Sequence, residues 1–212
     1  MNNYNKKKAA KILFNARQHL KRIEKLPKKY TPKNTKEGYE IQNELSKLYF
    51  SFNKSINIVG KKIGCTNLEA QKQINIDQPF YGNIFSNHFS QTGSLIQSND
   101  FFSPFIEPEF SFKIKEDIRP KKHPYSREEI IQMIHSVIPS IEIVDSRFND
   151  WTKVGINNLI ADNGAHAHWI IGKEKKNLKD YNLNDHKVDL YINKKIVKKG
   201  NSYNVLENPI NS

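Results

Sequence analysis

The sequence predicts an α+β domain with a mixed β-sheet. Two observations support this class: apolar residues recur at helical spacing in the first 54 residues, and extended segments alternate with short helices from residue 55 onward. Hydrophobic residues make up only 37% of the 212 residues. A core built from so few apolar residues should be concentrated in the strands. We therefore expect a helical segment over residues 1–54 and a sheet-containing domain over residues 55–212.

Two amphipathic helices are expected at the start of the chain. Over residues 6–26 the apolar positions follow the helical period, and they are Ala9, Ile12, Leu13, Ala16, Leu20 and Ile23. A polar break with two prolines follows. The second helix should begin after Asn34, whose side chain can cap the backbone at Glu37. Its apolar stripe is formed by Ile41, Leu45, Leu48 and Phe52. We interpret both helices as packing elements.

Residues 55–66 are expected to form a strand bounded by glycines. A helix should follow, opened by a capping box of Thr66 and Glu69. Because neighbouring side chains of a strand face opposite sides, at most one of Lys61 and Lys62 points inward. An inward lysine beside carboxylates would be a proton donor or an electrostatic partner for an anionic substrate. The alternative is two surface lysines.

The central candidate is a strand over residues 105–112. Glu107 and Glu109 stand two residues apart in it, so their side chains should project from one face. Pro108 fits between them only at a strand edge or a bulge. Two carboxylates held side by side repel each other unless a proton or a cation lies between them. The structural alternative is a solvated strand face.

A second acidic strand is expected over residues 139–147. Glu142 lies there among apolar neighbours, where a bare charge is costly to bury. A capping box at Ser126 should open the helix before this strand, and we expect that helix to continue through Val137. Together with the two glutamates of the first strand, Glu142 completes a predicted oxygen cage for Mg²⁺ or Mn²⁺.

The remaining segments have weaker patterns. Residues 77–104 are expected to form a long loop with room for short strands, and loops of this length are often lids over sites. A short helix is expected over residues 156–161. Residues 188–198 alternate about Asn193 and Lys194, which predicts a hairpin.

A strand over residues 165–172 carries two histidines. His166 and His168 should share one face of it, and imidazoles in that arrangement can bind zinc. No cysteine or third histidine lies at a fitting spacing, so zinc is an open alternative and not the expectation.

Charge and composition limit the classes of partner. The formal net charge is +12, which invites a nucleic-acid interpretation. Nearly all of it comes from dispersed lysines, whereas arginine, the better phosphate ligand, is scarce, so nucleic acid is not the expected partner. No apolar run reaches membrane-spanning length, and no signal-peptide core follows the basic start. The single cysteine, Cys65, excludes an intramolecular disulfide and is favoured as a small buried thiol. We expect a cytoplasmic protein.

A series of short motifs covers nearly the whole chain. They are GYEIQ (38–42), VGKKIGCT (59–66), DQPFYG (77–82), IEPE (106–109), IEIVDSR (141–147) with DW (150–151), ADN (161–163) and, more loosely, LENP (206–209). In this order and spacing the set resembles the 2-keto-4-pentenoate hydratase branch of the fumarylacetoacetate hydrolase superfamily, which also contains 4-oxalocrotonate decarboxylase.

The resemblance implies a fold and a set of site residues. The fold is a mixed β-roll of the fumarylacetoacetase C-terminal type, with the N-terminal helices packed outside it. A divalent metal, Mg²⁺ or Mn²⁺, is implied at Glu107, Glu109 and Glu142. Lys62 is implied to face the substrate as a catalytic residue, and Asp77 matches an acidic position near the same pocket.

The activity implied by the resemblance is that of a hydratase, a metal-dependent lyase. It would add water to a small 2-hydroxy-2,4-dienoate to give a 4-hydroxy-2-oxo acid, with the metal stabilising the enolate and Lys62 or an ordered water moving protons. Decarboxylation of a 2-oxo-enoate and C–C hydrolysis of an acylpyruvate stay open. The non-enzymatic alternative is a truncated basic binding module. The expected partners are a small 2-oxo acid and further copies of the chain in a homo-oligomer.

The chain departs from the family pattern in three places. After Asp162 and Asn163, two imidazoles stand where the family usually has small residues including a serine. Glu207 occupies a position that is usually glycine. The chain ends at Ser212, before the closing strands of the family roll, so we expect either a fragment or an open roll.

Overall fold

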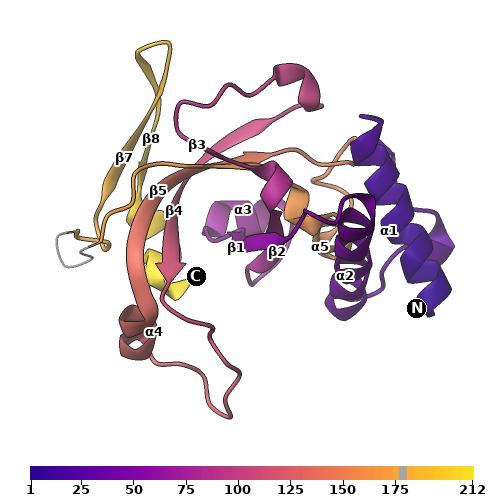
Figure 1. The fold of residues 1–212 in the computed structure, drawn as a ribbon, viewed down its shortest axis with the longest axis horizontal. Coiled ribbons are helices and arrows are strands. Elements are labelled where there is room, and N and C mark those ends of the chain that lie inside the picture. The colour runs from indigo at the N-terminus through magenta and orange to yellow at the C-terminus, as the bar shows by residue number, and fades with distance from the viewer. Residues whose placement is uncertain (177–180) are drawn as a thin grey trace.

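The computed structural model describes residues 1–176 and 181–212 as a fold of helices and strands (Figure 1). Its α-helices are α1 (Asn3–Gln18), α2 (Thr35–Phe52), α3 (Leu68–Gln73), α4 (Arg127–Met133) and α5 (Ile156–Ala161). Its strands are β1 (Ile58–Gly64), β2 (Phe80–Phe85), β3 (Phe89–Gln91), β4 (Phe105–Ile114), β5 (Ile134–Val144), β6 (His166–Ile171), β7 (Lys187–Ile192) and β8 (Lys195–Asn201). The paired helices α1 and α2 lie at one end of the molecule, and β4 and β5 curve across the other (Figure 1).

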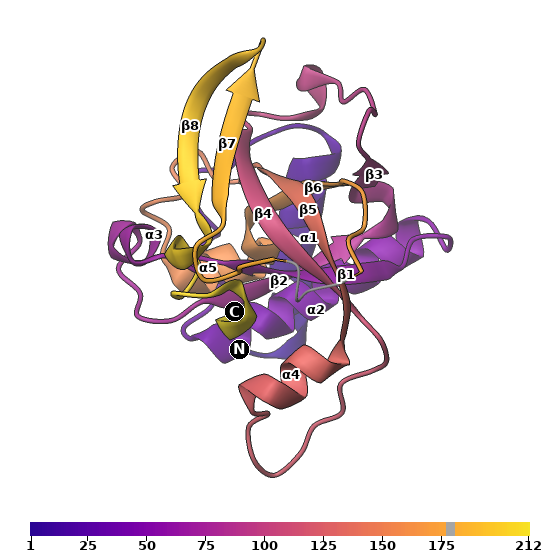
Figure 2. The same cartoon turned by 90° about the vertical axis from the view of Figure 1, so that its left-hand side faces the viewer.

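Within the described residues, the strands form three sheets. The largest has the order β3-β6-β5-β4, while β1 pairs with β2 and β7 pairs with β8. β3 runs parallel to β6, and the other pairs are antiparallel. The α+β class with a mixed sheet is therefore confirmed. The β7–β8 hairpin projects from one end of the molecule (Figure 2).

The first helix is shorter than expected. The sequence predicted it over residues 6–26, but α1 ends at Gln18, and Leu20 adopts the left-handed backbone conformation with φ 46°. That conformation cannot continue a right-handed helix. The turn lets the following segment run alongside Phe148, with the Ile23 amide donating to the Arg147 carbonyl at 2.9 Å. Ile23 therefore packs against the hydrophobic core as part of an isolated β-bridge with Phe148, and not as part of a helix.

The second helix begins as predicted. The Asn34 side chain accepts a hydrogen bond from the Glu37 amide at 2.9 Å. Buried Ile41 and Leu45 share a core with α1 and also with Phe85 of β2. The boundary expected at residue 54 stays a prediction.

Helix α2 also packs closely against α5. Buried Gln42 of α2 donates to the carbonyls of Ile160 at 3.0 Å and Tyr81 at 3.1 Å, which ties the helix to both α5 and β2. Gly38 allows the close approach, because a Cβ there would lie 2.7 Å from the Asn157 carbonyl oxygen and 3.2 Å from Ile160.

Strand β1 lies within the predicted segment. Residues 77–104 were expected to form a long loop with room for short strands, and they contain the short strands β2 and β3, of which β2 pairs antiparallel with β1 along most of its length. Five of the six residues of β2 are buried, so the strand lacks the polar alternation that marks a half-buried strand. The predicted cap of α3 was wrong: Asn67, not Thr66, accepts the capping hydrogen bond, from the Ala70 amide at 2.7 Å.

Strands β4 and β5 form the longest ladder. β4 lies at the edge of its sheet, which satisfies the constraint that Pro108 places on it. The capping box at Ser126 is confirmed, but the helix does not continue to Val137. α4 ends at Met133, and β5 begins at Ile134 because the chain there pairs with the far end of β4.

The C-terminal hairpin has the predicted turn. Asn193 and Lys194 have φ values of 49° and 65°, as the two central residues of a type I′ turn require. Among the described residues, no helix has both the length and the apolar character needed to cross a membrane.

The close approach at Gly38 can be tested by substitution. Gly38→Ala should lower the free energy of unfolding by about 1–3 kcal/mol, because the added methyl group meets the α5 backbone and overpacks the interface. Gly200→Ala is the matched control, since a Cβ there meets nothing within 4 Å. Urea unfolding of both variants measures the difference, and equal stability would contradict the α2–α5 packing.

Candidate active site

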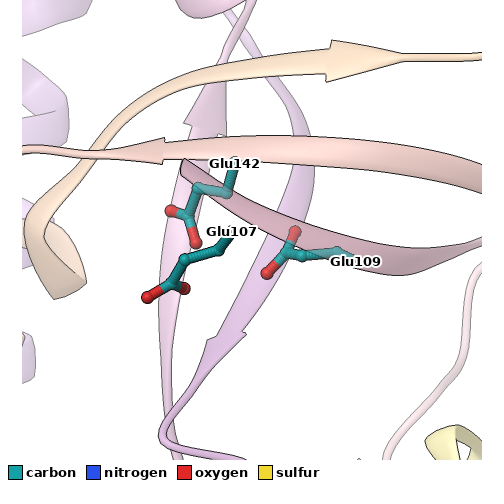
Figure 3. Close-up of side chains that lie close together, drawn as sticks. All are labelled: Glu107, Glu109 and Glu142. Atoms are coloured by element: carbon teal, nitrogen blue, oxygen red, sulfur yellow. The ribbon is translucent and has the colours of Figure 1, made fainter. Parts of the chain in front are cut away.

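Three glutamates of β4 and β5 converge on one point (Figure 3). Glu107 lies directly opposite Glu142 in the ladder, and Glu109 follows Glu107 on the same face. One carboxylate oxygen from each residue lies within 4.8 Å of the other two. The structure thus brings together the three carboxylates that the sequence singled out.

The carboxylates sit in unequal surroundings. As whole residues, Glu142 is buried, Glu109 is half-buried and Glu107 is exposed. Burial raises the pKa of Glu109 well above its ordinary value, and the charge of Glu142 raises it further. Desolvation of its carboxylate group and the charge of Glu142 also raise the pKa of Glu107, against the pull of Lys62. Burial is thus the main cause of both raised pKa values, and the neighbouring carboxylate adds to it.

Lys62 is the cation that reaches this cluster. Its side chain is 5% exposed, and its Nζ lies 3.2 Å from Glu142 Oε2. Burial alone would lower the pKa of Lys62, but Glu142, Glu107 and Glu109 outweigh it and raise the pKa. Lys62 is therefore held as an ammonium group.

Three glycines lie beside the Lys62 side chain and leave space for it. A Cβ at Gly164 would lie 2.9 Å from Lys62 Cε, and one at Gly82 would lie 3.4 Å from the same atom. A Cβ at Gly64 would lie 3.4 Å from Lys62 Nζ and would also meet Phe80. The absence of side chains at these positions leaves room for an extended lysine to reach the carboxylates.

Lys61 points the other way on β1. It hydrogen bonds to Asn83 of β2, and its ammonium group lies over the ring of Tyr81. Only Lys62 of the two lysines contacts the acidic cluster. Its catalytic role stays a prediction.

Glu142 has a second buried partner that sequence reasoning missed. His166 Nδ1 lies 2.7 Å from Glu142 Oε1, and both side chains are almost wholly inaccessible. Burial raises the pKa of Glu142, but Lys62 and the hydrogen bond from His166 outweigh it and lower the pKa. Burial also lowers the pKa of His166.

The two histidines do not share a face, so that prediction was wrong. A register shift pairs His166 with Val144 and His168 with Ile143, which are consecutive residues of β5. Their side chains therefore take opposite sides. His168 makes its hydrogen bond to Ser90 Oγ at 3.0 Å instead. This geometry removes the zinc alternative that rested on a shared face.

Asp77 and Cys65 are not members of the carboxylate cluster. Asp77 is exposed between α3 and β2, and no hydrogen bond or ion pair links it to the cluster in the described part of the chain. Its predicted role is not supported by a contact. Burial raises the pKa of Cys65 to about 11, so this side chain is a thiol at neutral pH, as expected, but it is half-buried and not fully buried.

A buried network of charges braces the far end of β5. Arg147 donates to the carboxylate of Asp162, and Ser146 Oγ donates to it at 3.1 Å. Asp145 accepts hydrogen bonds from the Phe102 amide at 3.0 Å and the Ser103 amide at 2.9 Å, and it pairs with Arg17 of α1 at 3.4 Å. These contacts hold the strand that carries Glu142 against its neighbours.

The donor set fits a hard divalent cation. Its ligand atoms are all carboxylate oxygens, which Mg²⁺ and Mn²⁺ prefer. Three carboxylates with one lysine beside them leave an excess of negative charge that a divalent cation would balance. The cluster of Glu107, Glu109 and Glu142 can therefore hold a divalent cation.

Sequence relatives carry a consistent set of names. The chain is 30% identical over 155 residues to 2-keto-4-pentenoate hydratase 1 of Dechloromonas aromatica, covering 73% of this chain and 58% of the relative. It is 28% identical over 173 residues to 2-keto-4-pentenoate hydratase of Burkholderia vietnamiensis, covering 82% and 63%. It is 27% identical over 164 residues to 2-hydroxyhexa-2,4-dienoate hydratase of Comamonas testosteroni, covering 76% and 60%. The chain thus spans about three fifths of the length of these curated relatives.

The fold has a solved counterpart. It superposes with a TM-score of 0.90 on 4-oxalocrotonate decarboxylase from Pseudomonas putida G7 complexed with magnesium and adipate, at 23% identity over 99% of this chain and 78% of that one. No family model matches the chain. The resemblance to the 2-keto-4-pentenoate hydratase branch is confirmed by the sequence relatives.

The carboxylate cluster makes a testable contribution to stability. The folded-state pKa of Glu109 is raised above its ordinary value of 4.5, so the stability that its protonated form contributes is fully present below pH 4.5 and is lost as the pH rises through the raised pKa. In divalent-free buffer, Glu109→Gln should therefore be more stable than wild type at pH 7, and the advantage should shrink toward pH 4.

Urea unfolding in EDTA across this pH range measures the effect. Glu116→Gln, an exposed glutamate of the following loop, is the control. A Glu109→Gln variant that is less stable than wild type by the same amount at every pH would contradict the crowding of the carboxylates.

Proposed function

We propose that the chain is a metal-dependent hydratase that adds water to a small 2-hydroxy-2,4-dienoate and gives a 4-hydroxy-2-oxo acid. The observation that carries this proposal is the buried lysine whose ammonium group lies against a cluster of carboxylates, with Nζ of Lys62 3.2 Å from Glu142. The names of the sequence relatives supply the substrate class. The relatives that carry these names are longer than this chain, and what this chain contributes to the proposal is the cluster of Lys62 and the three glutamates.

Glu107, Glu109 and Glu142 would hold Mg²⁺ or Mn²⁺. When bound, a divalent cation supplies Lewis-acid stabilisation of the negative charge that develops on a 2-oxo acid. The carboxylates neutralise that cation and give it a fixed place on a rigid pair of strands. The magnesium in the solved counterpart with the same fold supports this assignment.

Lys62 would move the proton. Its Nζ is held protonated beside Glu142 and is nearly shielded from bulk water. From there it can donate to the dienoate carbon during ketonisation, as the 2-hydroxyl group loses its proton, and it can take a proton back from the water that adds to the conjugated double bond. The enolate formed by that addition takes up the proton that the 2-hydroxyl group released. Glu142 stabilises the ammonium form before the first step and after the second. We keep Asp77 as a second catalytic candidate on the family resemblance alone, and it is exposed just before the start of β2.

Decarboxylation is the second candidate. The solved structure with the same fold is named a decarboxylase, and the same residues would stabilise the charge left by departing CO₂. Acylpyruvate C–C hydrolysis and a basic binding module without turnover are the other outcomes of the test below. We also propose that the sheet forms part of a β-roll over residues 55–212, that residues 1–54 pack outside it, and that the protein is a cytoplasmic homo-oligomer.

The metal site is tested by binding. Glu107→Ala and Glu142→Ala should each abolish Mn²⁺ binding, because each removes a ligand from a cluster of three. Isothermal titration calorimetry and the electron paramagnetic resonance signal of free Mn²⁺ measure the loss, with Glu116→Ala as the control. Unchanged affinity in both variants would reject the metal assignment.

The proton-transfer role is tested by turnover. Lys62→Ala should reduce the rate of dienoate hydration by about 10²–10⁴-fold, whereas Lys61→Ala should leave most of it, because only Lys62 reaches the carboxylates. Proton NMR of products from dienoate, 2-oxo-enoate and acylpyruvate substrates distinguishes hydration, decarboxylation and C–C hydrolysis. Equal losses in the two variants would remove the role of Lys62.

The non-enzymatic alternative is tested separately. Salt-sensitive binding to DNA or RNA without metal-dependent turnover would favour the binding module.

A further inference from the structure

His166 stands outside the ligand set but in direct contact with it. Its Nδ1 lies 2.7 Å from Glu142 Oε1, and both side chains are 1% exposed or less. The second ring nitrogen, Nε2, is buried and has no hydrogen-bond partner among the described residues. The imidazole is therefore bound to the rest of the site through a single hydrogen bond.

The contact selects one tautomer of the ring. With the proton on Nδ1, the ring donates to a carboxylate oxygen, and the buried Nε2 is left as a bare acceptor. With the proton on Nε2, a lone pair would face the carboxylate oxygen at 2.7 Å, and a buried N–H would have no partner. Orphaned buried N–H groups are rare because they cost the full desolvation penalty. The geometry thus favours the Nδ1–H form.

The backbone around His166 is held rigidly. Its carbonyl accepts a hydrogen bond from the Arg147 guanidinium at 3.0 Å, and that arginine is paired with buried Asp162. The register shift in β6 places His166 opposite Val144, which lies on the same face of β5 as Glu142. The ring is thus aimed at the Glu142 carboxylate by the sheet itself.

The opposite edge of the carboxylate faces the centre of the site. His166 holds Oε1, while Oε2 lies 3.2 Å from Lys62 Nζ. A glutamate has three rotatable bonds, so a second anchor removes most of its freedom. In this arrangement one carboxylate oxygen is committed to the histidine, and the other is available to Lys62 and to the cluster.

We propose that His166 is a positioning residue that donates from Nδ1 to Glu142 and thereby presents Oε2 of this glutamate to a divalent cation shared with Glu107 and Glu109. The inference rests on the proposed metal site and deepens it. It assigns a structural use to an imidazole that stands where the resembled family usually has small residues. Partners of this kind orient a metal ligand, and their loss typically costs 10–100-fold in affinity.

The test uses three variants and no substrate. His166→Leu should weaken Mn²⁺ binding by about 10–100-fold, because it fills the space without donating. His166→Asn should restore most of the affinity, since its amide nitrogen stands near the place of the ring Nδ1. His168→Leu is the matched control: its ring bonds to Ser90, so Mn²⁺ affinity should not change. Titration calorimetry gives the dissociation constants, and near-ultraviolet circular dichroism checks that each variant is folded.

A second readout is independent of the metal. Long-range ¹H–¹⁵N correlation spectra of the divalent-free wild type should show His166 protonated at Nδ1. A ring protonated only at Nε2 would overturn the inference, and this measurement stands even if His166→Leu does not fold. If wild type binds Mn²⁺ and folded His166→Leu binds it equally, the positioning role is wrong while the metal site remains. If wild type binds no Mn²⁺, the proposed function fails, and the spectrum alone decides whether His166 donates to Glu142.

Discussion

The structure depends on the burial of Lys62 against Glu142. An isolated charge in a protein interior costs far more than most folding contacts return, and a buried ion pair is tolerable only when its remaining hydrogen-bonding capacity is met. Here His166 donates a hydrogen bond to the carboxylate oxygen of Glu142 that does not contact Lys62. The glycines of β1, β2 and the turn before β6 leave space for the lysine side chain. Removal of Lys62 or of Glu142 would leave the charge of the other residue uncompensated inside the protein.

Much of the fold could be predicted from local patterns. The Asn34 and Ser126 caps, the edge strand that tolerates Pro108 and the turn at Asn193 all follow from residues within a few positions of one another. The errors arose where tertiary contacts override the local pattern. Leu20 continues a helical period but turns the chain toward Phe148. The bounds of β2 could not be predicted, because five of its six residues are buried and its sequence lacks alternation.

Part of the candidate site could likewise be predicted from local patterns, and part of it could not. The spacing of Glu107 and Glu109 and the apolar setting of Glu142 were enough to predict that carboxylates gather, because strand geometry places alternate residues on one face. The contact between His166 and Glu142 could not be predicted, since it depends on a one-residue register shift that periodicity does not reveal. Similarly, nothing in the sequence shows that glycines from three separate segments line one lysine.

The ion pair between Arg17 and Asp145 links the first helix to the acidic strands. Asp145 directly follows β5, three residues beyond Glu142, and it also anchors the amides of Phe102 and Ser103 just before β4 begins. Through Asp145, helix α1 is therefore connected to the end of β5 and to the segment that leads into β4. A shift of this helix would change the distances between the glutamates of β4 and β5. Substitutions on its buried face should therefore change the affinity of the carboxylate cluster for a cation without touching the cluster.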